Sequence, residues 1–70
     1  MKARELLRLL ERELDYGVVR QTGSHRTLKA PGRPTLHFAF HDSQTISPGL
    51  VRKILVTDVG LSIHDAEALL

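Results

Sequence analysis

Hydrophobic residues near the start of the chain recur every three or four positions, a spacing typical of one face of an α-helix. These residues are Ala3, Leu6, Leu7, Leu10 and Leu14. The pattern predicts a helix over residues 2–15 with Gly17 as its C-cap. Arg4, Arg8 and Arg12 lie on the opposite side, where acids three residues later predict a solvated, ion-paired face.

Three short β-prone segments follow the predicted helix. The first runs from Val18 to Thr22, and Gly23-Ser24 then turns the chain into the second, from His25 to Ala30. Pro31-Gly32 marks another turn. The third segment, Thr35 to His41, alternates between apolar and polar residues, as a half-buried strand does. Because the connections are short, we expect an antiparallel meander with one apolar and one polar face.

The apolar positions of the second and third segments fix their register. Leu28 must stand opposite Leu36, because a slip of one residue would put Leu28 on the polar face. This register makes residues 31–33 a three-residue loop. It also turns Arg26 toward the covered face, where its charged end must reach back to water.

The same register gathers histidines on the polar face. His25 stands opposite the small Ala39, which leaves room for a ligand, and His37 and His41 become its diagonal neighbours, about 7–8 Å away. His37 and His41 are four residues apart, about 13 Å along a strand, so they cannot bind the same metal ion. This spacing argues against a three-histidine zinc site.

The last third of the chain predicts two helices. Ser47-Pro48 pairs an N-cap residue with a proline at the first helical position. The helix that follows ends at Gly60, and its apolar stripe consists of Leu50, Val51, Ile54, Leu55 and Val59. Residues 62–65 resemble a capping box and open a short last helix that reaches Leu70. A helix, a meander and two helices make an α+β fold of two layers.

Length and composition set limits on the function. Seventy residues form one domain, residues 1–70, whose core typically leaves only about 3–5 kcal/mol of stability. A deep, enclosed active site is therefore not expected. The absence of cysteine excludes disulfides and thiolate metal sites. The first residues resemble neither a signal peptide nor a membrane span, so we expect a soluble, cytoplasmic protein.

The charges are distributed unevenly, although the net charge is only +2. Residues 17–41 contain four lysines and arginines, three histidines and no acid, while all eight carboxylates lie outside this segment. A basic middle segment is typical of a phosphate-binding face.

The turn at Gly23-Ser24 delivers His25 and Arg26 to the start of a strand. A histidine beside a fixed cation can transfer protons at a phosphate. A plainer interpretation is an ordinary hairpin with a surface histidine. Ser24 and His25 point to opposite faces and cannot act as a nucleophile and its base. No phosphate-binding glycine motif occurs. An exposed imidazole on a basic surface favours RNA, because a ribose carries its own 2′-OH nucleophile.

The order and spacing of these motifs resemble the HicA toxins of bacterial and archaeal toxin–antitoxin systems over nearly the whole chain. The motifs are Tyr16-Gly17, Val19-Arg20-Gln21, Gly23-Ser24-His25, Pro31-Gly32, His41, Ser47-Pro48-Gly49-Leu50, Arg52-Lys53-Ile54-Leu55 and Val59-Gly60-Leu61. At the third strand this chain has Ala39-Phe40, where family members often have Val-Pro or Ile-Pro before the histidine.

The resemblance implies a fold like the double-stranded RNA-binding domain and a ribonuclease that acts on messenger RNA without a cofactor. It also implies neutralisation by a HicB antitoxin. The essential histidine of the family falls on His25, which we expect to be the general base. The expected RNA contacts are Arg20, Ser24, Arg26, Lys29 and His41, and His41 could also serve as the general acid. Two other hypotheses are a non-catalytic RNA-binding domain of the same fold and a small subunit of a larger complex.

Overall fold

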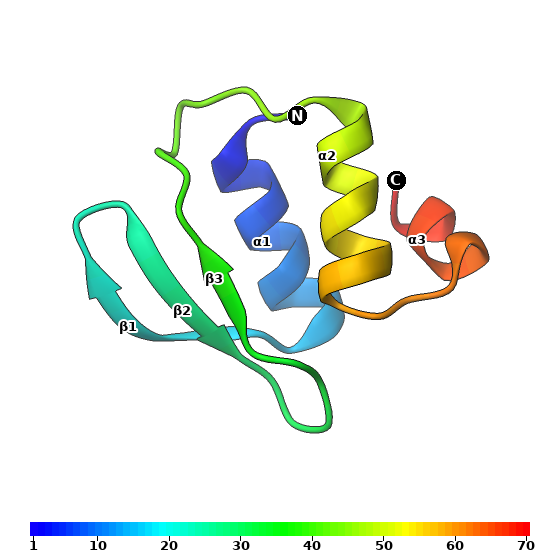
Figure 1. The fold of residues 1–70 in the computed structure, drawn as a ribbon, viewed down its shortest axis with the longest axis horizontal. Coiled ribbons are helices and arrows are strands. Elements are labelled where there is room, and N and C mark those ends of the chain that lie inside the picture. The colour runs from blue at the N-terminus through cyan, green and yellow to red at the C-terminus, as the bar shows by residue number, and fades with distance from the viewer.

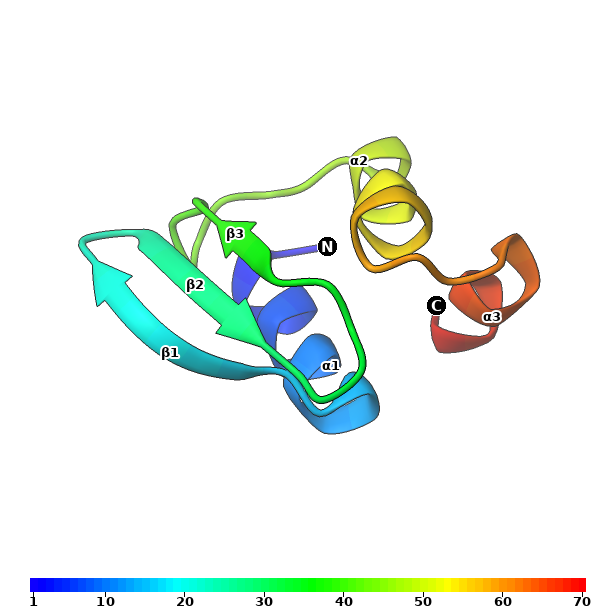
Figure 2. The same cartoon turned by 60° about the horizontal axis from the view of Figure 1, so that its bottom comes forward.

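The computed structural model describes all 70 residues and confirms the predicted α+β fold. The elements in chain order are α1 (Ala3–Leu14), β1 (Gly17–Thr22), β2 (His25–Lys29), β3 (Leu36–Phe38), α2 (Pro48–Lys53), η1 (Ile54–Asp58) and α3 (Ile63–Leu69). Figures 1 and 2 show the helices on one side of a three-stranded sheet, with α3 farthest from it. The other face of the sheet is therefore left open.

Helix α1 begins and ends within one residue of the predicted bounds. The Glu5 side chain accepts a hydrogen bond from the Lys2 backbone N–H at 3.1 Å, which satisfies a free donor at the start of the helix. Asp15, not Gly17, ends the helix, with a left-handed φ of 61°. Aspartate is one of the few residues besides glycine that tolerate this conformation. The prediction of Gly17 as the C-cap was wrong, and Gly17 begins β1 instead.

The sheet has the order β1-β2-β3, and both pairs are antiparallel. Leu28 pairs with Leu36, which confirms the predicted register. Gly23, in the turn between β1 and β2, has a φ of 60°, a conformation that glycine adopts without steric cost. β3 is shorter than predicted, because its ladder ends at Phe38 and does not continue to His41.

A β-bulge at Val19 interrupts the pairing of β1 with β2. Val18 pairs with Leu28, but Arg20 pairs with Thr27, so two residues of β1 advance the chain by one residue of β2. In a regular strand Val18 and Arg20 would lie on the same face. The bulge re-aims the following side chain, so Arg20 lies on the face opposite to Val18.

The second helical region begins as predicted and then departs from the prediction. The Ser47 Oγ accepts a hydrogen bond from the Leu50 backbone N–H at 3.3 Å, and Pro48 is the first helical residue. The expected single α-helix to Gly60 becomes α2 followed by a π-helical turn, η1, in which the Val59 N–H donates to the Ile54 carbonyl. The predicted cap of α3 is present, since the Ser62 Oγ accepts from the Asp65 N–H at 3.0 Å.

One hydrophobic core joins the helices to the covered face of the sheet. Its fully buried side chains include Leu6 and Leu10 of α1, Leu28 of β2 and Leu55 of η1. Tyr16 is also buried, and its hydroxyl donates to the Pro34 carbonyl at 2.7 Å, which ties the start of β1 to the loop between β2 and β3. None of the helices is both long enough and apolar enough to cross a membrane.

Two predicted members of the apolar stripes are less buried than expected. Leu7 is only partly buried and Leu9 takes the buried position in α1, while Leu50 of α2 is 37% exposed.

The segment between β3 and α2 is held against the start of α1. The Ala3 N–H donates to the Gln44 carbonyl at 2.8 Å, the Arg4 N–H donates to the Asp42 carbonyl at 3.2 Å, and the Ile46 N–H donates to the Met1 carbonyl at 2.8 Å. These bonds hold Asp42 beside the start of α1.

Candidate functional site

The open face of the sheet carries the predicted catalytic histidine. Along β2, Arg26 and Leu28 face the helices, so the alternate residues His25, Thr27 and Lys29 face away from them. The side chains of His25 and Lys29 are exposed. A large substrate could therefore reach His25 without any opening of the core.

Neighbouring strands add two polar side chains to this face. Thr27 stands between Arg20 of β1 and His37 of β3, and directly paired residues share a face. The row Arg20, Thr27 and His37 crosses all three strands. The bulge at Val19 is the reason that Arg20 belongs to this row, because regular pairing would have placed it on the covered face.

His25 and His37 share a shallow cavity. His37 pairs with Thr27, two residues along β2 from His25, so the two histidines are diagonal neighbours, as the register predicted. The cavity has a volume of about 60 Å³ and is lined by His25, Arg26, Thr27, His37, Phe38 and Ala39. Two imidazoles therefore flank one small hollow on an open face that also carries the cations Arg20 and Lys29.

Arg26 points to the other face of the sheet, as its place in the register predicted. Its side chain is only 12% exposed, and its Nη2 lies 2.8 Å from Oδ1 of Asp42. Its Nη1 is buried and has no hydrogen-bond partner. Asp42 comes 16 residues later in the chain, and no local sequence pattern indicates this ion pair. The ion pair neutralises part of the charge that a phosphate would meet at Arg26.

His41 does not line the cavity of the other two histidines. Because the β3 ladder ends at Phe38, the chain leaves the sheet before His41. A second cavity, of about 530 Å³, lies beside the turn between β1 and β2 and is lined by Arg4, Gly23, Ser24, Arg26, Phe40, His41, Asp42 and Ser43. The predicted RNA contacts thus form two groups, with Arg20 and Lys29 on the open face and Ser24, Arg26 and His41 around this cavity.

Sequence reasoning missed several residues of these two cavities. Arg4 was expected on a solvated, ion-paired helix face, but it lines the second cavity, and the only ion pair on that helix joins Arg12 to Glu13 at 3.4 Å. Asp42 was missed because it is distant in sequence from Arg26. Thr27 was missed because no motif includes it, although its alternation with Leu28 would have placed it on the open face.

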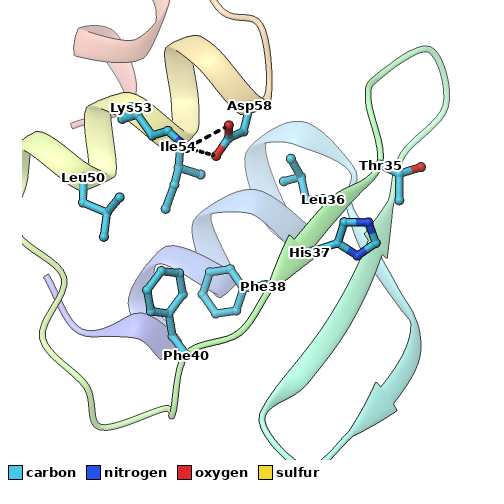
Figure 3. Close-up of a pocket in the computed structure, with 9 residues that line it drawn as sticks. All are labelled: Thr35, Leu36, His37, Phe38, Phe40, Leu50, Lys53, Ile54 and Asp58. Atoms are coloured by element: carbon cyan, nitrogen blue, oxygen red, sulfur yellow. Dashed lines mark hydrogen bonds and ion pairs between the residues drawn. The ribbon is translucent and has the colours of Figure 1, made fainter.

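A third cavity, of about 410 Å³, lies between β3 and the helical segment α2-η1 (Figure 3). Its walls are mainly apolar and include Leu36, Phe38, Phe40, Leu50 and Ile54. Lys53 and Asp58 form an ion pair with each other at its rim, at 3.2 Å. His37 also lines this cavity, although its ring lies on the side of β3 away from Leu36 and Phe38 (Figure 3).

The structure contains no group of three or more histidine, cysteine, aspartate or glutamate side chains that could hold a metal ion.

The family model described as "HicA toxin of bacterial toxin-antitoxin" matches residues 3–61 of the 70-residue chain. This match spans every strand and both helices that pack on the sheet. No curated protein and no solved structure matches the chain.

Proposed function

The chain belongs to the HicA toxin family of bacterial toxin–antitoxin systems, and we propose that it exerts its toxicity by cleaving messenger RNA, with His25 as the general base. The observation that carries this proposal is the position of His25, an exposed imidazole in a shallow hollow of an open face. The charged side chains that share this face, Arg20 and Lys29, are cations. A polyanion is thus attracted to the face that holds the base.

The proposed reaction needs little from the protein. His25 accepts the proton of a ribose 2′-OH, and the resulting oxygen attacks the adjacent phosphorus. The bond from phosphorus to the 5′-oxygen breaks, and that oxygen leaves with a proton. The products are a 2′,3′-cyclic phosphate and a 5′-hydroxyl. One positioned base contributes typically ~10²–10⁴-fold to the rate, so we expect a slow enzyme.

We propose two groups of phosphate contacts. Arg20 and Lys29 hold the phosphates next to His25 on the open face. Ser24, Arg26 and His41 contact the RNA where it passes the tip of the turn, and Arg26 contributes there a charge that Asp42 partly neutralises. An RNA strand that crosses the tip can meet both groups, because Gly23 and Ser24, which line the second cavity, directly precede His25 in the chain.

The experiment that tests this proposal is cleavage of end-labelled RNA by the purified protein in the presence of EDTA. Histidine chemistry predicts unchanged cleavage and products that end in a 2′,3′-cyclic phosphate. Loss of cleavage in EDTA, with recovery on adding a divalent cation, would contradict the histidine mechanism. Binding of RNA without any cleavage would assign the protein to the non-catalytic RNA-binding class.

We also propose that a HicB-like antitoxin neutralises the protein in the cytoplasm by covering the open face. A small, shallow site is most simply inhibited by occlusion. Hydrogen exchange of the complex should show protection of amides in β2 and β3 and in the turn between β1 and β2. Protection confined to α1 would argue against occlusion of the site.

A further inference from the structure

The geometry points to His37 as a second catalytic residue, the general acid that protonates the leaving 5′-oxygen. This inference rests on the proposed ribonuclease function and deepens it. The family resemblance gives His37 no role. Its position in the sheet carries the argument.

His37 stands on the same face and in the same hollow as the proposed base. Its partner across the strands is Thr27, so the β-carbon of His37 is a diagonal neighbour of that of His25, about 7–8 Å away or somewhat less. Both imidazoles line the cavity of about 60 Å³. Ala39 also lines this cavity, and its side chain is too small to fill the space.

This separation suits a phosphodiester between the two rings. In an in-line displacement the attacking and leaving oxygens lie on opposite sides of the phosphorus, so the base and the acid must also stand on opposite sides. Each ring needs to come within about 2.6–3.2 Å of its oxygen. Two rings on diagonal positions of adjacent strands can do this, whereas two rings in contact could not.

Each proton that moves in this step has a donor and an acceptor. His25 takes the proton of the 2′-OH as the bond from the 2′-oxygen to phosphorus forms. The bond from phosphorus to the 5′-oxygen breaks, and that oxygen takes a proton from the imidazolium of His37. After one cleavage His25 carries the extra proton and His37 is neutral, and exchange with water restores both.

His41 is less well placed for this role. It follows the end of the β3 ladder and lines the separate cavity with Ser24 and Arg26. His37 lies within the ladder, and its ring points toward the open face (Figure 3). The hydrogen-bonded ladder therefore holds the backbone of His37, but not that of His41, in place.

The test uses two RNA substrates that differ only at the leaving atom. One carries the ordinary 5′-oxygen at the cleavage position, and the other carries a bridging sulfur, which leaves as a thiolate without a proton. The His37→Ala variant should cleave the ordinary substrate about 10²-fold more slowly than the parent. It should cleave the sulfur substrate at the parental rate. His25→Ala should be slow on both, since the base is needed in either case.

His41→Ala is the matched control, because it removes another exposed imidazole of the same chain. We expect it to show no selective recovery with the sulfur substrate. Parental cleavage of the ordinary RNA by His37→Ala would overturn the assignment, and so would an equal loss on both substrates or a recovery seen with His41→Ala. A parental protein that cleaves neither substrate would instead refute the ribonuclease function itself.

Discussion

The two faces of the sheet treat neighbouring residues in opposite ways. On the covered face Leu28 is fully buried, and Arg26 is mostly buried and bound to Asp42. On the open face His25 and Lys29, which alternate with them along β2, are exposed and take part in none of the four ion pairs of the protein. Alternate residues of β2 thus pack against the core, and the residues between them face solvent, where they can contact a substrate. Changes on the two faces should therefore have different consequences.

The largest effect should come from Leu28→Ala on the covered face. Removing a fully buried leucine side chain costs about 2–5 kcal/mol, comparable to the whole stability of about 3–5 kcal/mol expected of so small a core. Urea unfolding should show that this variant is largely unfolded without urea or unfolds at a very low urea concentration. Thr27→Ala, one residue away on the open face, is the control and should change the unfolding midpoint little. Equal losses in both variants would refute the separation of the faces.

His25→Ala should produce the opposite result. We expect cleavage of RNA to fall by at least ~10²-fold, because the proton acceptor is lost. The free energy of unfolding should change by well under ~1 kcal/mol, because the exposed side chain leaves no cavity in the core. RNA cleavage and urea unfolding measured on the same preparation check both parts. A well-folded variant that cleaves at the parental rate would return the chain to the class of binding modules.

Tyr16→Phe should have a moderate effect that is confined to stability and depends on pH. Burial raises the pKa of the Tyr16 hydroxyl above its ordinary value of 10.0, and the charge of Arg33 partly opposes this. Because the folded protein holds the phenolic proton more tightly than the unfolded chain, this stabilisation is complete below pH 10 and is lost as the pH rises through the folded pKa.

Urea unfolding between pH 7 and pH 11 tests this prediction. Tyr16→Phe should be less stable by about 1 kcal/mol at pH 7, since the Pro34 carbonyl loses its donor. It should also lose less stability than the parent above pH 10, because it has no phenolic proton to lose. Tyr16 is the only tyrosine, so its ultraviolet titration can be followed directly. A parallel alkaline loss in both proteins would contradict the raised pKa.

The smallest effect should be that of Arg20→Ala on the binding of RNA. Each phosphate contact contributes roughly 0.7–0.9 to the slope of log affinity against log salt. The slope for this variant should be shallower by the contribution of about one contact. Arg52→Ala is the matched control, because Arg52 donates to Glu67 at 2.7 Å, and that hydrogen bond raises the pKa of Arg52. Equal slopes for the parent and Arg20→Ala would show that this cation does not touch the RNA backbone.

The sequence predicted those features that depend on neighbouring positions. Strict alternation in β3 fixed the register of Leu28 with Leu36 and, through it, the direction of Arg26. Serine and proline in the first turn marked the start of α2. These features depend on residues that are close together in the sequence, so a local sequence pattern can indicate them.

The features that the sequence did not predict depend on packing across the fold. The bulge at Val19 selects the face of Arg20, and the pairing of Arg26 with Asp42 requires the loop that α1 holds in place. The π-helical turn of η1 has no pattern of its own. The early end of β3 leaves His41 outside the ladder, where it lines another cavity than His25, and alternation alone could not reveal this.

The bulge at Val19 also has a consequence for self-association. β1 is an edge strand, and a regular edge offers unpaired backbone groups to any other chain, which promotes aggregation. Val19 is 59% exposed on this edge and would favour such pairing. The extra residue twists the strand and interrupts its regular pattern, which disfavours pairing with a second copy there. At the opposite edge, β3 has only three residues and offers a short template. We therefore expect the irregularity that directs Arg20 to the open face also to disfavour intermolecular sheets.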